Sequence, residues 1–385
     1  MSEIKVNSIK GVGASAAAIT VNNTDGTCTA NITNNLSNRN KVINGSAIVS
    51  QRGSNTVVGV ADGGFFCADR FKHVINAIGG YTIHHEADAP SGFSHSHKVQ
   101  TTTADTSLDA GSVYMIRYIF EGQDVQDFAK GTSDAKQYSL SFFVKTTNFT
   151  GTFVVELIDS VNTRHCCKSY TVSSAGSWQK VELIFPADTT GAITSDNAGR
   201  FEMNFYIGAG SGYTAGTLQT AWGGRSGNTN RATGQTAQIG SSTSNRFQIT
   251  GVQLEVGSVA TDFEHRSFAQ ELALCQRYYI SFPAGYIGGG RGGSGGSLLL
   301  YNYYLPTPLR ASPTFEPSSA WSSSNGIRAY KYNGQSDSTS TPTLGSGGYI
   351  TNASFVYTSM AGHSIDDDRV ASFIHNNTLA LNAEL

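Results

Sequence analysis

Charged residues are scarce in this chain: Asp, Glu, Lys and Arg make up 14% of its 385 residues. Helix surfaces are normally filled with Glu, Lys and Arg, so this scarcity argues against a helical protein. The formal net charge of −2 provides no basic field that would gather nucleic acid or an anionic membrane surface. We therefore expect no nucleic-acid partner.

Long hydrophobic runs are also lacking. No run approaches the roughly 18 apolar residues that span a bilayer, and the first residues, MSEIKVNSIK, lack the apolar region of a signal peptide. We expect a soluble protein that is made in a cytoplasm and inserts into no membrane.

The cysteines do not form a regular pattern. They are five, an odd number, at irregular spacings and without a CxxC pair, which predicts buried reduced thiols rather than a disulfide framework. Cys166 and Cys167 are adjacent on a predicted strand, so their side chains should face opposite sides.

Glycine, serine, threonine and asparagine are abundant, and they separate segments of alternating apolar and polar residues. These segments cover residues 81–85, 94–104, 113–120, 138–147, 152–159, 165–172, 178–186, 200–208 and 247–256. Such alternation is typical of half-buried strands, and eight or more strands without intervening helices predict a β-sandwich. The fold class that we expect is therefore all-β.

The periodicity changes after Gly257. Four residues at spacings of three and four should share one helix face: Phe268, Leu272, Cys275 and Tyr279. Thr261 or Asp262 is the expected N-cap, and Glu264 stands at capping-box spacing from Thr261.

Four parts follow from these patterns: an extended N-terminal arm (1–42), the sandwich (43–258), a linker helix (259–282) and a small C-terminal β-domain (283–385). The arm has few large apolar residues and cannot bury a core of its own, so it should become ordered on another chain or another protein. A flexible tail is the alternative. Residues 287–297 (IGGGRGGSGGS) are predicted to form a flexible loop.

Several segments resemble tail-fibre and related virion proteins of tailed bacteriophages. They are GVQLEVG followed by TDFEHRSFAQELALCQRYY, INGSAIVSQRG with ADRF, LSFFVKTTNFTGTFVVELID and SWQKVELIFPADTTGA, and the resemblance covers about residues 43–280. It implies a jelly roll similar to carbohydrate-binding modules, followed by a small β-domain that begins near PTPLRASP. Phe71 departs from the pattern, which more often has Trp there, and this puts an aromatic binding platform at that position in doubt.

Sugar recognition uses exposed aromatic faces beside Asn, Asp and Arg, which bond to the hydroxyls. The long polar segment 213–231 fits this description best, with a second cluster in the C-terminal domain. The glycan-binding candidates are Tyr213, Trp222, Arg225 and Asn228 in the first and Tyr330 and Tyr332 in the second. Core or inter-subunit packing is the alternative for these aromatic residues.

Metal binding and catalysis have weaker candidates. His95 and His97 would face the same side of a strand and could hold an axial metal in a trimer, although two solvent-facing or hydrogen-bonded histidines are the simpler interpretation. Asp366, Asp367 and Asp368 match no calcium loop. GxSxG and HExxH motifs are absent, while Glu156, Asp159 and Glu182 could in principle form a glycosidase pair. We expect no cofactor, no resident metal and no enzymatic activity.

The resemblance and the composition together predict a phage virion structural protein. The leading hypothesis is a homotrimeric tail fibre, assembled with other virion proteins through its arm, that attaches to host-surface glycan without catalysis. A head fibre, capsid decoration or tail adaptor that binds only virion proteins is the alternative, and a polysaccharide depolymerase is a third.

Overall fold

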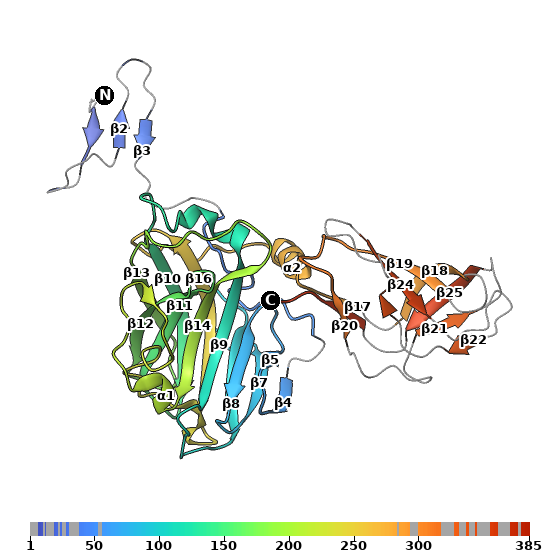
Figure 1. Ribbon diagram of the computed structural model, residues 1–385, viewed down its shortest axis with the longest axis horizontal. Helices are drawn as coiled ribbons and strands as arrows, with labels where there is room; N and C mark the ends of the chain where they lie inside the picture. The colour runs from blue at the N-terminus through green and yellow to red at the C-terminus, as the bar shows by residue number, and fades with distance from the viewer. Residues whose placement is uncertain are drawn as a thin grey trace.

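The computed structural model describes residues 7–10, 12, 19–21, 24, 28–30, 38–52, 56–282, 285–292, 299–316, 327–330, 336–338, 343–344, 355–360, 370–375 and 379–385. The predicted all-β class is confirmed: two antiparallel sheets form a jelly-roll sandwich, which a linker helix and a smaller β-unit follow (Figure 1). No helix among these residues is long and apolar enough to cross a membrane.

The first layer of the sandwich, which we name the β16 sheet, has six strands. In spatial order they are β13 (Gln179–Phe185), β10 (Tyr138–Thr147), β16 (Arg246–Val256), β8 (Ser96–Thr103), β7 (Gly80–Glu86) and β4 (Thr56–Val60).

The second layer, the β14 sheet, has seven strands. They are β15 (Gly223–Gly224), β12 (Arg164–Val172), β11 (Gly151–Asp159), β14 (Gly199–Ala209), β9 (Val113–Glu121), β6 (Lys72–Asn76) and β5 (Gly64–Phe65). Short helical turns interrupt the connections: η1 (Gly122–Phe128), α1 (Ser211–Thr214) and η2 (Ile239–Ser241).

The core lies between the two layers and follows the alternation in sequence. In β14, Phe201, Met203 and Phe205 point inward, whereas Glu202 and Asn204 lie on the outer face. Cys166 and Cys167 face opposite sides as predicted, since only Cys166 belongs to this core. The four cysteine side chains within the described part of the chain are buried and unpaired with one another.

The linker helix α2 (Phe268–Gln276) starts later than its expected cap. Ser267 is the N-cap, and it forms a capping box with Gln270. The prediction of Thr261 or Asp262 is wrong because the Thr261 hydroxyl bonds to Glu255 instead. Of the four residues expected on one helix face, Tyr279 lies outside the helix, because α2 ends at Gln276 and β17 begins at Tyr279.

The chain leaves the helix through β17 (Tyr279–Phe282) and comes back beside it. β26 (Leu379–Asn382) pairs with both β17 and β20 (Thr314–Glu316), so it is the central strand of a three-stranded sheet. β17 and β26, the strands on either side of residues 283–378, therefore lie side by side next to the jelly roll (Figure 1).

Seven strands from the chain between β17 and β26 form a further antiparallel sheet. Its spatial order is β22 (Ser336–Ser338), β21 (Ile327–Tyr330), β25 (Val370–His375), β18 (Gly285–Gly292), β19 (Leu299–Tyr304), β24 (Phe355–Met360) and β23 (Thr343–Leu344). The loop predicted for residues 287–297 is wrong up to Gly292, because pairing with β25 orders a glycine-rich backbone without help from side chains.

The arm contributes a separate three-stranded antiparallel sheet of β1 (Ser8–Ile9), β2 (Ile19–Val21) and β3 (Cys28–Ala30). It stands away from the jelly roll in Figure 1, and Ile9 is 54% exposed. Val42 is already fully buried in the sandwich core. The boundaries of the four parts stay a prediction.

Two buried histidines give the core a dependence on pH. His73 and His97 lie between the layers with ring centroids 6.4 Å apart, and both nitrogens of His97 lack a hydrogen-bond partner among the described residues. Burial lowers the pKa of His73 to about 3 and that of His97 well below its ordinary value. In the unfolded chain both histidines bind protons below about pH 6.5.

We therefore expect the free energy of unfolding to fall below pH 6.5 by about 1.4 kcal/mol per pH unit for each histidine. Asp69 opposes this, since burial raises its carboxyl pKa to about 6 and the protonated form is favoured in the folded state. Urea unfolding at pH 7 and pH 5 would measure the net effect of the two histidines and Asp69 on the free energy of unfolding. The His97→Phe variant should lose less stability on acidification than the wild type. The His265→Phe variant, which changes an exposed histidine, should behave like the wild type. If the free energy of unfolding falls equally with pH in all three proteins, buried His97 does not cause the pH dependence.

Candidate functional site

Residues 210–237, which include the predicted segment 213–231, fold over the outer face of the β14 sheet. Its anchor is Arg231, whose guanidinium donates to both carboxylate oxygens of Glu156 at 2.8–3.1 Å. Glu156 is fully buried on β11, and Tyr206 and His165 bond to it at 2.9 and 2.7 Å. Burial alone would raise the pKa of Glu156, but the bonds from His165 and Arg231 outweigh it and bring the pKa to about 2.

The four candidates of this segment do not form one site. Tyr213 and Asn228 both flank Arg231, since the guanidinium lies 5.8 Å from the Tyr213 ring and donates to Asn228 Oδ1 at 3.0 Å. Trp222 lies at a different place, with its indole N–H bonded to the carbonyl of Pro186 and its ring against the core. The backbone N–H of Arg225 donates to the carbonyl of Thr163 on the β11–β12 turn.

The second aromatic cluster cannot be assessed in the same way. Tyr330 is the last residue of β21, whose side chains are not described, and Tyr332 lies outside the described residues. Asp366, Asp367 and Asp368 lie outside them too. These candidates stay predictions.

His95 and His97 differ in burial. His95 precedes β8 and stacks on His85 with ring centroids 4.2 Å apart, whereas His97 is buried in the core beside Phe71. Strand pairing places His97 opposite His85, the residue on which His95 stacks, and metal binding by the two histidines stays a prediction. Phe71 is itself fully buried and provides no surface platform.

The carboxylates considered for a glycosidase pair have other partners. Glu156 is held by Arg231, and Asp159 accepts a hydrogen bond from Lys130 at 2.5 Å. Glu182 lies on the outer face of β13, 48% exposed, and pairs with Lys180. The two buried carboxylates are therefore neutralised by cations of the chain itself.

Glu156, His165 and Cys167 bring three potential metal-ligand atoms within 4.8 Å of one another. The donor set does not suit a cation, because the guanidinium of Arg231 already occupies both carboxylate oxygens. Glu156, His165 and Cys167 are better explained as part of the contacts that hold the 210–237 segment on the sheet.

The outer face of the β16 sheet carries a surface group that sequence analysis missed. Trp178, partly exposed just before β13, donates its indole N–H to Asp88 at 3.3 Å. Lys145 bonds to the same carboxylate and lies 5.5 Å from the indole ring, and Gln248 donates to Asp88 at 3.1 Å. We name Trp178, Asp88, Lys145 and Gln248 the Trp178 cluster.

This cluster continues as a polar row across the sheet. Strand pairing places Lys145 opposite Gln248, Gln248 opposite Lys98, and Lys98 opposite His84. At about 4.8 Å between strands, four paired strands span roughly 14 Å. The carboxylates are the accessible members of this row, since the Asp88 side chain is 46% exposed and that of Glu86, paired with Lys98, is 29% exposed. The Lys145 and Lys98 side chains are only 15% and 18% exposed, and Gln248 is buried. Sequence spacing could not bring these residues together, because they come from separate strands.

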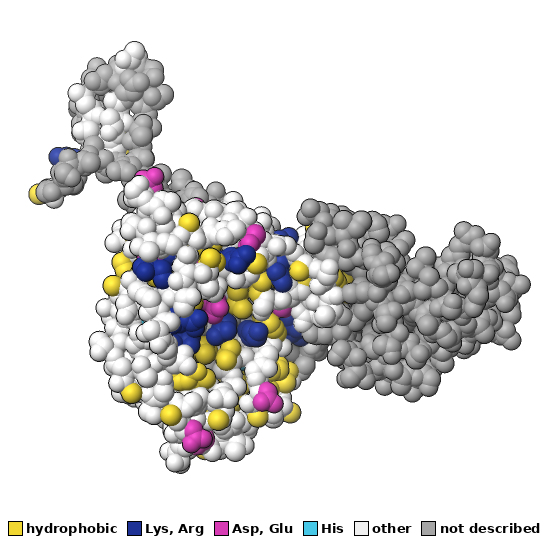
Figure 2. All heavy atoms as spheres, viewed as in Figure 1, with side chains coloured by type: hydrophobic (Ala, Val, Ile, Leu, Met, Phe, Trp, Pro, Cys, Tyr) yellow, Lys and Arg dark blue, Asp and Glu magenta, His cyan; other side chains and the backbone are white. Residues whose placement is uncertain are grey.

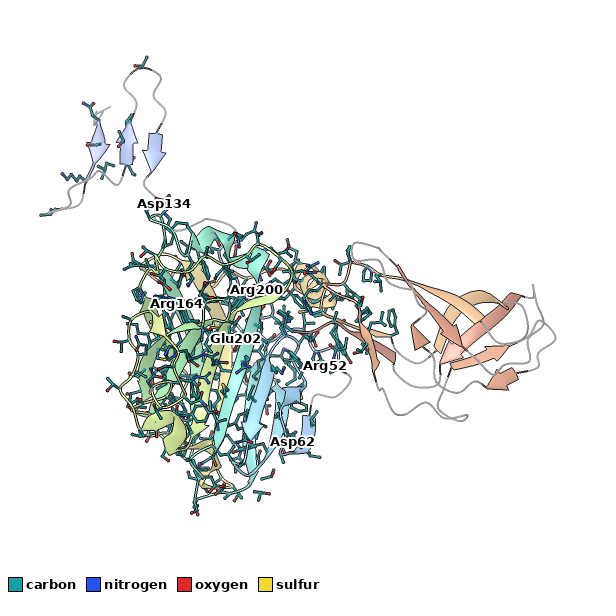
Figure 3. The ribbon with its side chains drawn as sticks, in the orientation of Figure 1. Arg52, Asp62, Asp134, Arg164, Arg200 and Glu202 are labelled. Atoms are coloured by element: carbon teal, nitrogen blue, oxygen red, sulfur yellow. The ribbon has the colours of Figure 1, made fainter. Side chains whose placement is uncertain are left out.

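The opposite face is also charged. Figure 2 shows a band of Lys and Arg side chains across the jelly roll with hydrophobic side chains between them, and Figure 3 labels Arg164, Arg200 and Glu202 on this side. Its arginines are paired with acids, for example Arg200 with Asp196 and Arg117 with Glu202. We find no aromatic side chain bonded into these pairs among the described residues.

No protein-family model matches the chain, and no curated protein matches it in sequence. Among solved structures, the enzymatically active domain of tailspike protein 4 of bacteriophage CBA120 is similar over 56% of this chain, with 13% identity and a TM-score of 0.29. This chain spans about a fifth of that protein's length (21%).

Carbohydrate-binding modules are similar at a comparable level. A xylan-binding domain of family 22 matches 50% of this chain and 90% of its own length, with 10% identity and a TM-score of 0.28. The corresponding module in xylanase 10B of Clostridium thermocellum matches 55% of this chain and 30% of that protein, with 13% identity and a TM-score of 0.27. At these TM-scores the likenesses say nothing about what this chain binds.

Proposed function

We propose that this protein is a bacteriophage virion structural protein, a tail fibre that attaches to host-surface glycan without catalysis. The sequence resemblance described above supports the virion assignment. The observation that carries glycan binding is the Trp178 cluster, where a partly exposed indole stands beside a half-exposed carboxylate and an ammonium on one sheet face.

The chemistry of this cluster fits a sugar ring. An indole offers an apolar surface for pyranose C–H groups, a carboxylate accepts from hydroxyls, and an ammonium donates to them. Asp88 is ready to accept because it is ionised at neutral pH: burial raises its pKa, but the bonds from Lys145, Gln248 and Trp178 outweigh this and lower it. The row leading to Lys98 and His84 provides further donors for neighbouring sugar units.

A single site of this kind binds weakly, and the proposed homotrimer addresses that weakness. Three chains joined through their arms would present three sites together, and linked sites gain avidity of order 10² or more through effective concentration. The arm suits assembly because it exposes Ile9 and carries only short strands.

Soluble full-length protein is expected to block phage adsorption to its host, and Trp178→Ala to weaken this block at least about tenfold, equivalent to about 1.4 kcal/mol. The physical reason is the loss of the stacking surface while the polar residues stay in place. The measurement is the protein concentration that halves adsorption.

Phe268→Ala is the matched control, because Phe268 is an exposed aromatic residue on α2, away from the sheet face. It should block adsorption as well as the wild type does. If wild-type protein fails to block at saturation, attachment is excluded and a role confined to virion proteins takes its place. Release of reducing ends from host glycan would overturn the non-catalytic part of the proposal.

A further inference from the structure

A buried amine lies at one end of the sandwich, in the turn between η1 and β10. The Lys130 side chain is 1% exposed, although lysine is almost never buried without a specific partner. Its neighbours Ala129 and Gly131 both have left-handed backbone, with φ of 48° and 81°. Glycine adopts this conformation readily, whereas it is unfavourable for Ala129.

The amine meets two carboxylates there. Lys130 Nζ lies 2.5 Å from Asp159 Oδ2 and 3.0 Å from Asp188 Oδ2, and the Asp159 side chain is fully buried. The Trp222 ring, with its centroid 5.4 Å from Nζ, closes the site on one side. Arg164 binds both oxygens of Asp188 at 2.8–2.9 Å, so Asp188 already has a second cation. Asp159 has no second cationic partner among the described residues.

A carboxamide shares that carboxylate oxygen. Asn162 Nδ2 lies 2.8 Å from Asp159 Oδ2, the same atom that contacts Lys130. A Cβ added at Gly191 would fall 2.6 Å from the Asn162 side-chain carbon, and the Gly191 carbonyl accepts a bond from Lys130 at 2.9 Å. The amine and the carboxamide are thus held against one carboxylate oxygen and one glycine.

We propose that Lys130 and Asn162 form an intramolecular isopeptide bond, with Asp159 as the catalytic residue. Asp159 takes a proton from the Lys130 ammonium, and the neutral amine attacks Cγ of Asn162. The Nζ–Cγ bond forms and Nζ loses a second proton. The Cγ–Nδ2 bond breaks, and the leaving nitrogen takes up that proton and the one that Asp159 returns. Since the lysine begins as an ammonium, the products are one secondary amide and one ammonium ion, and no oxidant or co-reactant is required.

The geometry favours this step, because the amine is buried against the carboxylate that also binds the carboxamide. Fixed proximity replaces an encounter between two molecules. Asn162 is only partly buried, so the released ammonia has a path to solvent.

The test is the intact mass of the denatured wild-type protein, followed by tryptic mapping. The mass should be lower than the sequence mass by one ammonia. Trypsin should not cut after Lys130 and should yield a branched peptide that joins residues 118–136 to 146–164. An unmodified mass, or separate peptides ending at Lys130 and Arg164, would overturn the proposal. A loss of one water would place the bond on an aspartate and overturn the assignment to Asn162.

Two variants check the pair. Lys130→Arg and Asn162→Ala should each restore the full sequence mass and unbranched peptides, whereas Asn197→Ala, at another surface turn, should keep the branched peptide. Cyclisation at an Asn-Gly step such as Asn44–Gly45 also releases ammonia, but it leaves no branched peptide. If either variant fails to fold, the wild-type map alone decides.

Discussion

Replacing Glu156 with alanine is expected to lower the free energy of unfolding by about 3–5 kcal/mol, the cost of leaving a buried charge without its partner. The carboxylate is the common acceptor for Arg231, His165 and Tyr206, all of which are buried. A domain has only about 5–15 kcal/mol of stability in total, so the variant should be close to unfolding. Urea denaturation followed by tryptophan fluorescence would measure the loss.

A second replacement separates charge from packing at this position. Glu156→Met combined with Arg231→Met removes both charges, so it should cost markedly less than Glu156→Ala. Equal costs would show that the ion pair is not what holds the 210–237 segment. In that case the contribution would come from the Tyr213 and Ala232 packing on the same face.

Glu384→Ala is expected to have a similarly large effect, about 3–5 kcal/mol, at the junction between the jelly roll and the following β-unit. Glu384 bonds to Arg70 and lies 3.1 Å from Arg52. The Arg70 guanidinium stacks 3.4 Å from the Tyr278 ring centroid and is only 2% exposed, so it cannot turn to solvent when the carboxylate is removed. Urea unfolding and the rate of limited proteolysis within residues 283–378 would report the change.

Glu182→Ala provides the matched comparison, because Glu182 also pairs with a cation but is 48% exposed. Exposed pairs contribute about 0–1 kcal/mol, so this variant should unfold almost as the wild type does. A Glu384→Ala variant that matches it in both stability and proteolysis would contradict the junction described here.

The sequence predicted the strands well because each strand of a sandwich carries its own alternation. β10 begins and ends at Tyr138 and Thr147 as expected, since turn residues flank a clear period of two. The helix cap was missed because Thr261, Asp262 and Ser267 are all suitable caps, and a tertiary bond from Thr261 to Glu255 decided between them.

The candidate site was less predictable for a related reason. Arg231 is 75 positions from Glu156, and no spacing rule links them. Trp178 was treated as part of a strand because Asp88, Lys145 and Gln248 meet it only through sheet register and a loop. The polarity of single strands can be read from sequence, whereas the partners on neighbouring strands require the fold.

The return of β26 beside β17 has a mechanical consequence. A unit attached by one linker can swivel, but residues 283–378 leave and rejoin the jelly roll through two adjacent strands paired over four positions. Tension applied to this unit is shared between two covalent connections, and torque must shear the strand pair before the unit can rotate. The β-unit between β17 and β26 therefore transmits load to the sandwich at Arg70 and Tyr278.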